Sequence, residues 1–318
     1  MGNYIHTSAH TPLFYRMFPG CGVLHAVQSN LGFSYSGTPY AQGTTPPAIT
    51  WTVPATFTRP CIIKCNTLGA LNTWKADVYY DGGTNKAESF TSAASVTLGS
   101  GIVLAIPAGN AAVNNTWTAW CSQWSDLSGN GSHKTPVGAG KPLFQPGLNG
   151  QTSVYGGGVA AMIATVALPN PSVTKVWRWL LFRQRTWSAN AIIAGGSSVQ
   201  NNTLIFQHTG SPNIAVYSGG FGTDNNGAAL NAWVRAEAEF NASNADYLKL
   251  GTVNPGPVAT GSATASATTG LFGYPGGTSL SDTECLAEVI GAGTYPTATQ
   301  FLAAGNAAQQ LYGAGLGI

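Results

Sequence analysis

Short runs of alternating apolar and polar residues dominate the chain, separated by clusters of glycine, proline, asparagine and aspartate. This pattern is typical of β-strands joined by turns. The runs predict strands at 49–53, 61–65, 74–80, 96–106, 116–124, 152–155, 159–167, 176–184, 191–194, 203–207, 214–217, 232–240, 247–249 and 284–290. The chain is therefore expected to be all-β.

The strand at 232–240 alternates most clearly. Its charged residues Arg235, Glu237 and Glu239 face one side, and apolar residues face the other. This predicts a half-buried strand with its charges in water. The alternative is a glycosidase pair formed by Glu237 and Glu239, whose i, i+2 spacing suits the carboxyl separation of such enzymes. The three-acid strand signature of sandwich glucanases is absent, so a solvated strand face is the preferred interpretation.

One helix is expected, near the C-terminal end. It starts at Pro296-Thr297 and ends at Tyr312-Gly313, and apolar residues recur between them at helical spacing. Trp177 and Trp179 are expected on one face of their strand, with Arg178 on the opposite face.

Three regions follow from these patterns. Residues 1–45 lack a clear period and contain several prolines, which predicts an extended N-terminal arm. Residues 46–115 form a small β-region whose topology the pattern does not assign. Residues 116–318 carry ten strands and the helix, which predicts a β-sandwich.

The composition narrows the classes of partner. Charged residues make up 8% of the 318 residues, against about 25% in ordinary globular proteins. The net charge is +2 with no basic run, which argues against nucleic acid because binding it needs clustered Lys or Arg. We expect no membrane segment, since no apolar run reaches the length of about 18 residues that spanning requires. The N-terminal residues lack the features of a signal peptide.

Five cysteines occur at no metal-site spacing: Cys21, Cys61, Cys65, Cys121 and Cys285. In an extended strand, Cys61 and Cys65 would lie too far apart for a disulfide. All five are expected to be buried thiols.

Several motifs, in order, resemble a known family. They are Trp124-Ser125-Asp126-Leu127-Ser128-Gly129-Asn130-Gly131-Ser132-His133, Lys141-Pro142-Leu143-Phe144, Leu148-Asn149-Gly150-Gln151, Asp246-Tyr247-Leu248-Lys249-Leu250-Gly251, Leu271-Phe272-Gly273, Leu286-Ala287-Glu288-Val289-Ile290 and Gln310-Leu311-Tyr312-Gly313. Together they resemble concanavalin A-like, laminin G-like modules. The resemblance covers residues 116–318 and implies a concanavalin A-like β-sandwich (jelly roll) of the kind found in phage structural proteins. The family's polar residue after the Asn-Gly strand is replaced by Tyr155-Gly156-Gly157-Gly158, so a metal or sugar role for that loop is not carried over.

Few residues suggest a site. Asp224, Asn225 and Asn226 form an oxygen-rich loop that could hold Ca²⁺, although a plain polar turn is the preferred interpretation. No other cofactor is expected. Asp126 and Asn130 are expected to form a turn. Glu288 is expected to accept backbone hydrogen bonds at the sandwich edge.

Aromatic residues suggest contacts of another kind. Most tryptophans are core candidates. Trp187, Trp233 and Tyr217 are candidates for contact with a glycan or a protein.

The function expected from these observations is that of a non-enzymatic structural protein of a phage virion, either a capsid decoration protein or a tail-associated one. The sandwich would be a rigid displayed block and the N-terminal arm would attach it. The expected partners are other virion proteins and further copies of the chain, and the expected location is the virion, assembled in the host cytoplasm. The alternative is a glycan-binding, receptor-recognition module of a fibre or a cell-surface protein, with a host surface glycan as ligand.

Overall fold

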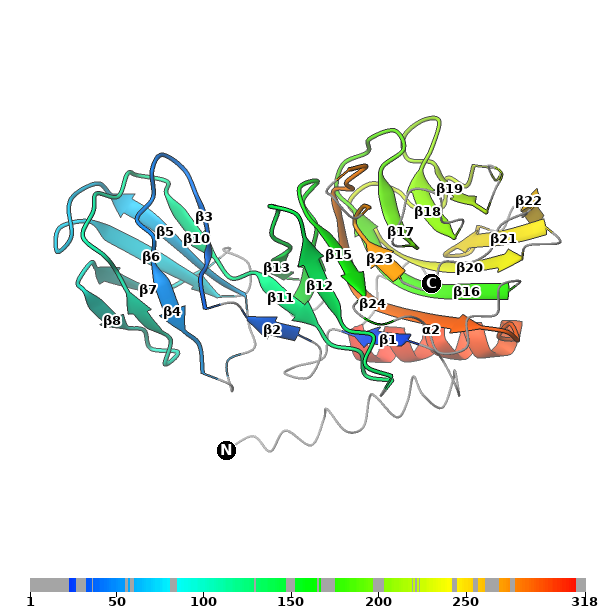
Figure 1. Cartoon of the computed structure of the whole chain (residues 1–318), viewed down its shortest axis with the longest axis horizontal. Coiled ribbons are helices and arrows are strands. Elements are labelled where there is room, and N and C mark those ends of the chain that lie inside the picture. The colour runs from blue at the N-terminus through cyan, green and yellow to red at the C-terminus, as the bar shows by residue number, and fades with distance from the viewer. Residues whose placement is uncertain are drawn as a thin grey trace.

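The computed structural model describes residues 23–26, 33–35, 37–54, 57, 60–80, 85–128, 130–146, 152–164, 166, 175–196, 203–218, 220, 222, 224–241, 245–253, 257–260, 269–274 and 278–312. These residues form two β-sandwiches that lie side by side (Figure 1). The prediction of an all-β sandwich fold is confirmed. No helix in these ranges is long and apolar enough to cross a membrane.

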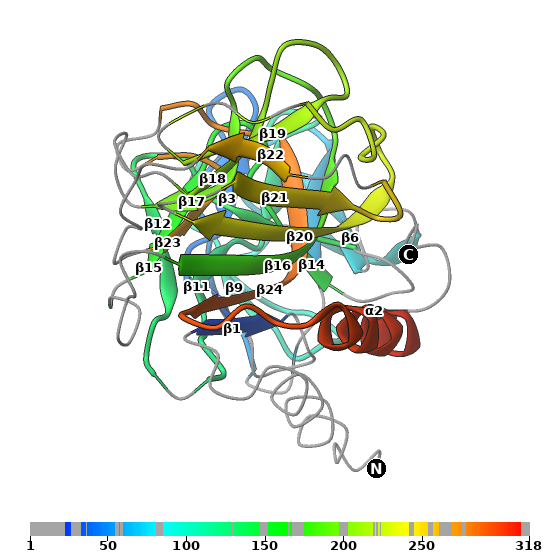
Figure 2. The same cartoon turned by 90° about the vertical axis from the view of Figure 1, so that its right-hand side faces the viewer.

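The C-terminal sandwich packs two eight-stranded antiparallel sheets against each other. Sheet A has the order β13 (Leu143–Pro146), β14 (Thr152–Tyr155), β24 (Thr283–Ala292), β16 (Lys175–Gln184), β20 (Trp233–Asn241), β21 (Ala245–Leu250) and β22 (Pro257–Thr260), with β1 (Val23–Ala26) also paired to β24. Sheet B has the order β19 (Ile214–Tyr217), β18 (Leu204–Gln207), β17 (Ile192–Gly196), β23 (Thr269–Leu271), β15 (Ala161–Ala164), β12 (Lys134–Val137), β11 (Cys121–Trp124) and β2 (Phe33–Tyr35). Figure 2 shows the strands of sheet A stacked from β21 to β1.

The N-terminal sandwich is smaller and has the topology that the sequence did not assign. Its five-stranded sheet C has the order β3 (Tyr40–Gln42), β10 (Thr116–Thr118), β5 (Cys61–Thr67), β6 (Lys75–Tyr80) and β7 (Lys86–Thr91). Its three-stranded sheet D has the order β4 (Thr50–Thr52), β9 (Val103–Ala105) and β8 (Ser95–Thr97). Buried side chains such as Ile63, Trp74 and Leu104 fill the space between the two sheets.

The helix α2 (Ala298–Tyr312) packs on the outer face of sheet A, the face turned away from sheet B (Figure 1). It begins at a capping box, in which Thr297 N–H donates to the Gln300 side chain at 2.7 Å and Gln300 N–H donates to Thr297 Oγ1 at 3.3 Å. Phe301 meets Trp177 edge to face, with ring centroids 6.2 Å apart. The helix prediction is confirmed.

The alternation of β16 explains this packing. Trp177 and Trp179 belong to the apolar cluster under α2, whereas Val176 and Leu180 belong to the core between the sheets. Arg178 points inward with the latter set, as its position in the alternation predicts. Both faces of β16 are therefore buried.

An ion cluster lies in the core of the C-terminal sandwich. Glu288 of β24 accepts from Lys134 Nζ of β12 at 2.5 Å and from Arg178 of β16 at 2.7 Å, and all three side chains are at most 1% exposed. Arg178 also donates to the carbonyl oxygen of Gly195 in β17, at 2.6 Å. Burial lowers the pKa of Lys134, and the Glu288 carboxylate opposes that shift. The expectation that Glu288 bonds backbone groups at the sandwich edge is wrong, because its partners are two side-chain cations that connect the two sheets.

The segment expected to be an extended arm, residues 1–45, contributes a strand to each of three sheets. β1 pairs with β24, β2 with β11 and β3 with β10. The described part of this segment is therefore built into both sandwiches rather than free for attachment. Its remaining residues, 1–22, 27–32 and 36, lie outside the described residues.

The two sandwiches share one continuous apolar core. β10 lies in sheet C and β11 in sheet B, so the chain crosses between them at Ala119 and Trp120, and the boundary falls slightly after the expected position at residue 116. The backbone N–H of Ala119 donates to Cys61 of the first sandwich and its carbonyl oxygen accepts from Phe144 of the second. One core cluster contains buried residues of both sandwiches.

Four cysteines are buried and unpaired with one another, namely Cys61, Cys65, Cys121 and Cys285. The prediction of buried thiols is confirmed for these four, and Cys21 lies outside the described residues. Burial raises the pKa of the Cys61 thiol to about 12, and the nearby charge of Glu88 adds to this shift. This thiol is therefore protonated at neutral pH and is a poor nucleophile.

Candidate functional site

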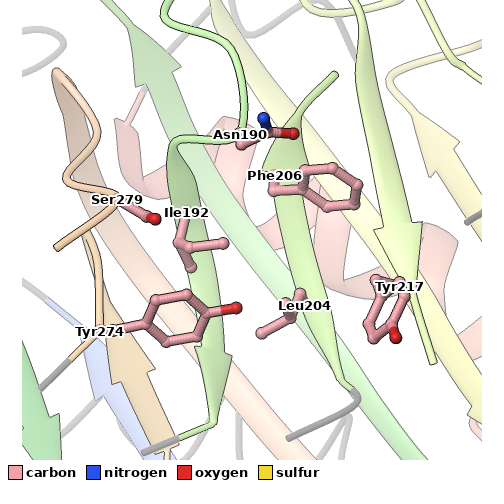
Figure 3. Close-up of a pocket in the computed structure, with 7 residues that line it drawn as sticks. All are labelled: Asn190, Ile192, Leu204, Phe206, Tyr217, Tyr274 and Ser279. Atoms are coloured by element: carbon pink, nitrogen blue, oxygen red, sulfur yellow. The ribbon is translucent and has the colours of Figure 1, made fainter. Parts of the chain in front are cut away.

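A pocket of about 290 Å³ opens on the outer face of sheet B, the face turned away from sheet A. The described residues that line it are Asn190, Ile192, Leu204, Phe206, Tyr217, Tyr274 and Ser279. Figure 3 shows them spread over β17 and the loop before it, β18, β19 and the segment that follows β23, with Tyr274 and Tyr217 on either side of Leu204. The pocket is thus built mainly on strands.

Strand alternation sends these side chains outward. In β18, Ile205 points into the main core while Leu204 and Phe206 join a separate apolar cluster. In β19, Val216 points inward while Tyr217 packs against that same outer cluster. Because β18 is apolar on both faces, it supplies the core and the pocket floor at once.

The segment after β23 carries Tyr274 and Ser279 to the pocket. The Tyr274 N–H donates to Thr278 at 3.1 Å, and the Ser279 carbonyl oxygen accepts from Ile192 N–H at 2.8 Å. Ser279 and Phe272 have φ angles of 50° and 65°, a left-handed conformation that costs a residue with a Cβ about 1–2 kcal/mol. Such strain is typical of binding and active sites, where the surrounding structure imposes it.

A buried glutamine fixes the opposite rim. Gln207 is fully buried beneath the loop 185–190, donates to the Thr186 carbonyl at 2.8 Å and accepts from Ser188 N–H at 3.0 Å. The N–H of Asn190 donates to the Gln207 carbonyl at 2.9 Å. The position of Asn190 at the pocket is therefore held by the strand that forms the floor.

None of the seven described lining side chains carries a charge at neutral pH. Burial and, to a lesser extent, Tyr217 raise the pKa of Tyr274, so its hydroxyl is protonated at neutral pH and can donate a hydrogen bond. Ile192, Leu204 and Phe206 are at most 5% exposed. The pocket thus combines an apolar floor with neutral polar groups around it.

Asp224 is connected to the pocket through His208. His208, whose ring meets that of the lining residue Phe206 edge to face at 5.2 Å, places its Nδ1 2.7 Å from Asp224 Oδ1. The hydroxyl of Thr209 donates to the other oxygen of Asp224. Both carboxylate oxygens therefore have protein partners.

The calcium prediction concerns Asp224 together with Asn225 and Asn226. The Asn225 side chain accepts from Gly227 N–H at 2.8 Å and donates to the carbonyls of Leu248 and Val253, while Asn226 is exposed. A calcium ion would have to replace these bonds, and Ca²⁺ binding stays a prediction. Among the described residues, no three His, Cys, Asp or Glu side chains gather closely enough to hold a metal ion.

The three aromatic candidates lie in different places. Tyr217 lines the pocket. Trp187 is half-buried and donates to the Asn213 carbonyl at 3.3 Å, and Trp233 is buried in sheet A beneath Arg183. Phe206 and Tyr274, which complete the aromatic lining, were not singled out from the sequence. No local signal separated them from core aromatics, since Phe206 and Tyr274 are themselves buried.

The carboxylates of β20 lie on the outer face of the other sheet. The expectation that the charges of this strand lie in water is wrong, because Arg235 and Glu237 are both 3% exposed. Arg235 Nε lies 2.8 Å from Glu237 Oε1. Burial and the neighbouring Glu237 raise the pKa of Glu239 to about 7. Neither carboxylate lines the pocket of sheet B.

Comparison with known proteins supports the fold alone. No family model matches the chain, and no curated protein sequence matches it. The chain is similar in fold to two solved structures of a GH54 α-L-arabinofuranosidase, one soaked with a cyclic sulfate inhibitor and one with 4-nitrophenyl α-L-arabinofuranoside. Both are 13% identical in sequence to this chain and cover 96% of it, with TM-scores of 0.49 and 0.50. This chain spans 65% of the length of those enzymes. A botulinum neurotoxin DC binding domain in complex with rat synaptotagmin II is 10% identical, covering 57% of this chain and 48% of that one, with a TM-score of 0.40.

Proposed function

We propose that this chain is a non-enzymatic saccharide-binding protein and that the pocket on sheet B is its binding site. The observation that carries the proposal is the lining of this pocket, where Tyr217 and Tyr274 flank an apolar floor that includes Phe206 and neutral polar groups stand at the rim. The volume of about 290 Å³ is close to the lower end of small-ligand pockets, roughly 300 Å³. It suits a small saccharide or the terminal residue of a larger one.

Sugars match this chemistry because they are amphipathic. The C–H faces of a sugar ring pack on aromatic rings, and its hydroxyls bond polar groups at the edges. Tyrosine supplies both an apolar ring and a hydroxyl, and two tyrosines flank the floor. The amide of Asn190 and the hydroxyl of Ser279 are exposed at the rim and can bond sugar hydroxyls.

Binding without turnover is proposed because the described lining holds no carboxyl group. Glycoside hydrolysis generally requires two carboxyl groups on either side of the scissile bond. Glu237 and Glu239 belong to sheet A, and Glu237 is engaged with Arg235. The pocket can therefore hold and orient a sugar but supplies no general acid from these residues.

Replacement of Tyr274 by alanine is expected to weaken saccharide binding at least about tenfold, since losing roughly 1.4 kcal/mol of ring contact and hydrogen bonding has that effect. The intact protein is first screened on a glycan array, and the best ligand is then titrated calorimetrically into wild type and Tyr274→Ala. The matched control is Tyr79→Ala, at a half-buried tyrosine of β6 in the other sandwich. Equal affinity of all three proteins for the ligand would contradict the proposed site.

A second function is proposed alongside the first, that of a structural protein of a phage virion, as a capsid decoration or tail-associated block. The motifs of residues 116–318 that resemble phage-associated modules support it. So does the continuous core across both sandwiches, which makes the chain a single stiff body suited to display. Other virion proteins and further copies of the chain would be its partners. A sugar pocket on such a block would serve host recognition.

Self-association is expected for this second function, because a chain with 8% charged residues and a net charge of +2 opposes contact between its copies only weakly. Light scattering of the intact chain over a concentration series should give a defined oligomer. The light-scattering measurement is repeated in a high-salt buffer, which screens the charges and so excludes association through ion pairs. A mass that stays at 32.7 kDa throughout would contradict self-association.

A further inference from the structure

The pocket floor differs chemically from its rim. Ile192 and Leu204 are aliphatic, Phe206 is aromatic, and all three belong to an apolar cluster on the outer face of sheet B. None of these side chains can form a hydrogen bond to a ligand. The hydroxyls of Tyr217 and Tyr274 and the side chains of Asn190 and Ser279 supply the polar groups, and Figure 3 shows Leu204 between the two tyrosines.

A sugar hydroxyl placed on this floor would lose its water and gain no partner, which disfavours binding. A methyl group in the same place would gain from burial in apolar surroundings. A pocket built of apolar side chains discriminates by about tenfold or more for one such group. The floor therefore fits a part of the ligand that carries no hydroxyl.

The charges around the site argue against an acidic sugar. None of the described lining residues is cationic. The carboxylate of Asp224 is held by His208, which contacts the floor residue Phe206. A buried carboxylate of a uronic or sialic acid would have no cation among the described lining residues to pair with.

We propose that the pocket selects a neutral sugar bearing a methyl group, either a 6-deoxyhexose or an N-acetylated hexosamine, and that this methyl group sits on Ile192, Leu204 and Phe206. The inference rests on the proposed saccharide-binding function and adds the class of sugar. The ring then packs against Tyr274 or Tyr217, and its hydroxyls face the rim. The shared chemistry is the methyl group, and the two classes of sugar differ in where it is attached.

The test uses matched sugars on the intact chain. All sugars are used as 2-hydroxyethyl glycosides, so that the aglycone carries no methyl group. The α-L-fucoside is compared with the α-L-galactoside, which differs by one hydroxyl on the exocyclic carbon. The N-acetyl-β-D-glucosaminide is compared with the β-D-glucoside, and the β-D-glucuronide serves as the acidic sugar. Affinities are measured by NMR titration, and saturation-transfer NMR identifies the ligand protons that touch the protein.

At least one methyl-bearing sugar is expected to bind about tenfold or more tightly than its partner, and its methyl protons should receive the strongest saturation. A difference in affinity within the fucoside pair assigns the methyl group to the deoxy position, and a difference within the glucosaminide pair assigns it to the acetamido group. The glucuronide is expected to bind most weakly. These measurements need no variant, so they stand even if a substitution fails to fold.

A variant then tests whether the ligand's methyl group contacts the pocket floor. Leu204→Thr puts a hydroxyl on the floor and is expected to reduce the preference for the methyl-bearing sugar to about threefold or less. Leu68→Thr, at a leucine that is 71% exposed in the other sandwich, is the control and should leave the preference unchanged. A loss of preference in both variants would contradict the assignment to the floor.

The outcomes separate the two proposals. If the sugars bind with equal affinity within each pair, the methyl preference is wrong while saccharide binding stands. If the glucuronide binds most tightly, the neutral-sugar inference is wrong. If no sugar in the series or on the glycan array binds, the proposed function itself is overturned.

Discussion

Replacement of Glu288 by alanine is expected to lower the free energy of unfolding by about 3–5 kcal/mol, the usual cost of breaking a buried ion pair from one side. Since proteins are stable by only about 5–15 kcal/mol, this loss is a large share of the total and should lower the urea midpoint clearly. The effect is expected because Glu288 is the anion in contact with both Lys134 and Arg178. Without it, two cations remain buried in a medium of low polarity.

Urea unfolding followed by tryptophan fluorescence measures the change. Lys86→Ala is the control, since Lys86 pairs with Asp77 at 3.7 Å on the surface and is 56% exposed, so its loss should cost at most about 1 kcal/mol. A second control removes all three buried charges with Glu288→Leu, Lys134→Met and Arg178→Met. Because an apolar core of similar volume needs no ion pairing, it should recover much of the lost stability. A Glu288→Ala protein with the urea midpoint of wild type would contradict the ion cluster.

Deletion of residues 1–45 is expected to abolish cooperative folding of both sandwiches. The deletion removes β1 from sheet A, β2 from sheet B and β3 from sheet C. Each loss leaves an unpaired strand edge, at β24, β11 and β10, and such edges promote aggregation. The side chain of Trp120 also loses its acceptor, the Thr38 carbonyl oxygen.

Circular dichroism during heating and size-exclusion chromatography measure the outcome of the deletion. The control is the same shortened chain refolded with a synthetic peptide of residues 1–45, which should restore a cooperative transition if the missing strands are the cause. A shortened chain that alone melts like the full chain would show that the N-terminal residues are an extended arm outside the folded body, as the sequence pattern predicted.

The sequence predicts those strands and helices whose pattern of apolar and polar residues lies within the element itself. β20 alternates over a full strand length, β16 is a long and mostly apolar run, and the helix has its capping box and apolar stripe within one segment. β1, β2 and β3 have three or four residues each, too few to show a period. Their pairing with distant strands decides their structure, as is general for strands.

The role of Glu288 was hidden for a related reason. Lys134 and Arg178 lie 154 and 110 positions away in the chain, and each looks like an ordinary charged residue in its own strand. Only the sheet topology brings them to one point. Arg235 and Glu237 were expected in water and are instead buried. Strict alternation indicates which residues share a face of the strand, but it does not indicate whether other residues cover that face.

The pocket was anticipated through Tyr217 alone. β17 and β18 are apolar on both faces, so their sequences do not distinguish core residues such as Ile193 and Ile205 from pocket residues such as Ile192 and Leu204. Tyr274 reaches the site through backbone conformations that the sequence does not disclose. An aromatic side chain at the end of a short strand was the one usable signal.

The most direct test of saccharide binding at sheet B is methyl NMR of the intact chain with labelled isoleucine and leucine, recorded while the best ligand of the sugar series is added. The methyl signals of Ile192 and Leu204 are predicted to shift with saturable dependence on sugar concentration, while those of Ile63 and Leu104 in the N-terminal sandwich remain in place. Saturable shifts that spare Ile192 and Leu204, or an unchanged spectrum with every sugar tested, would contradict binding at this pocket.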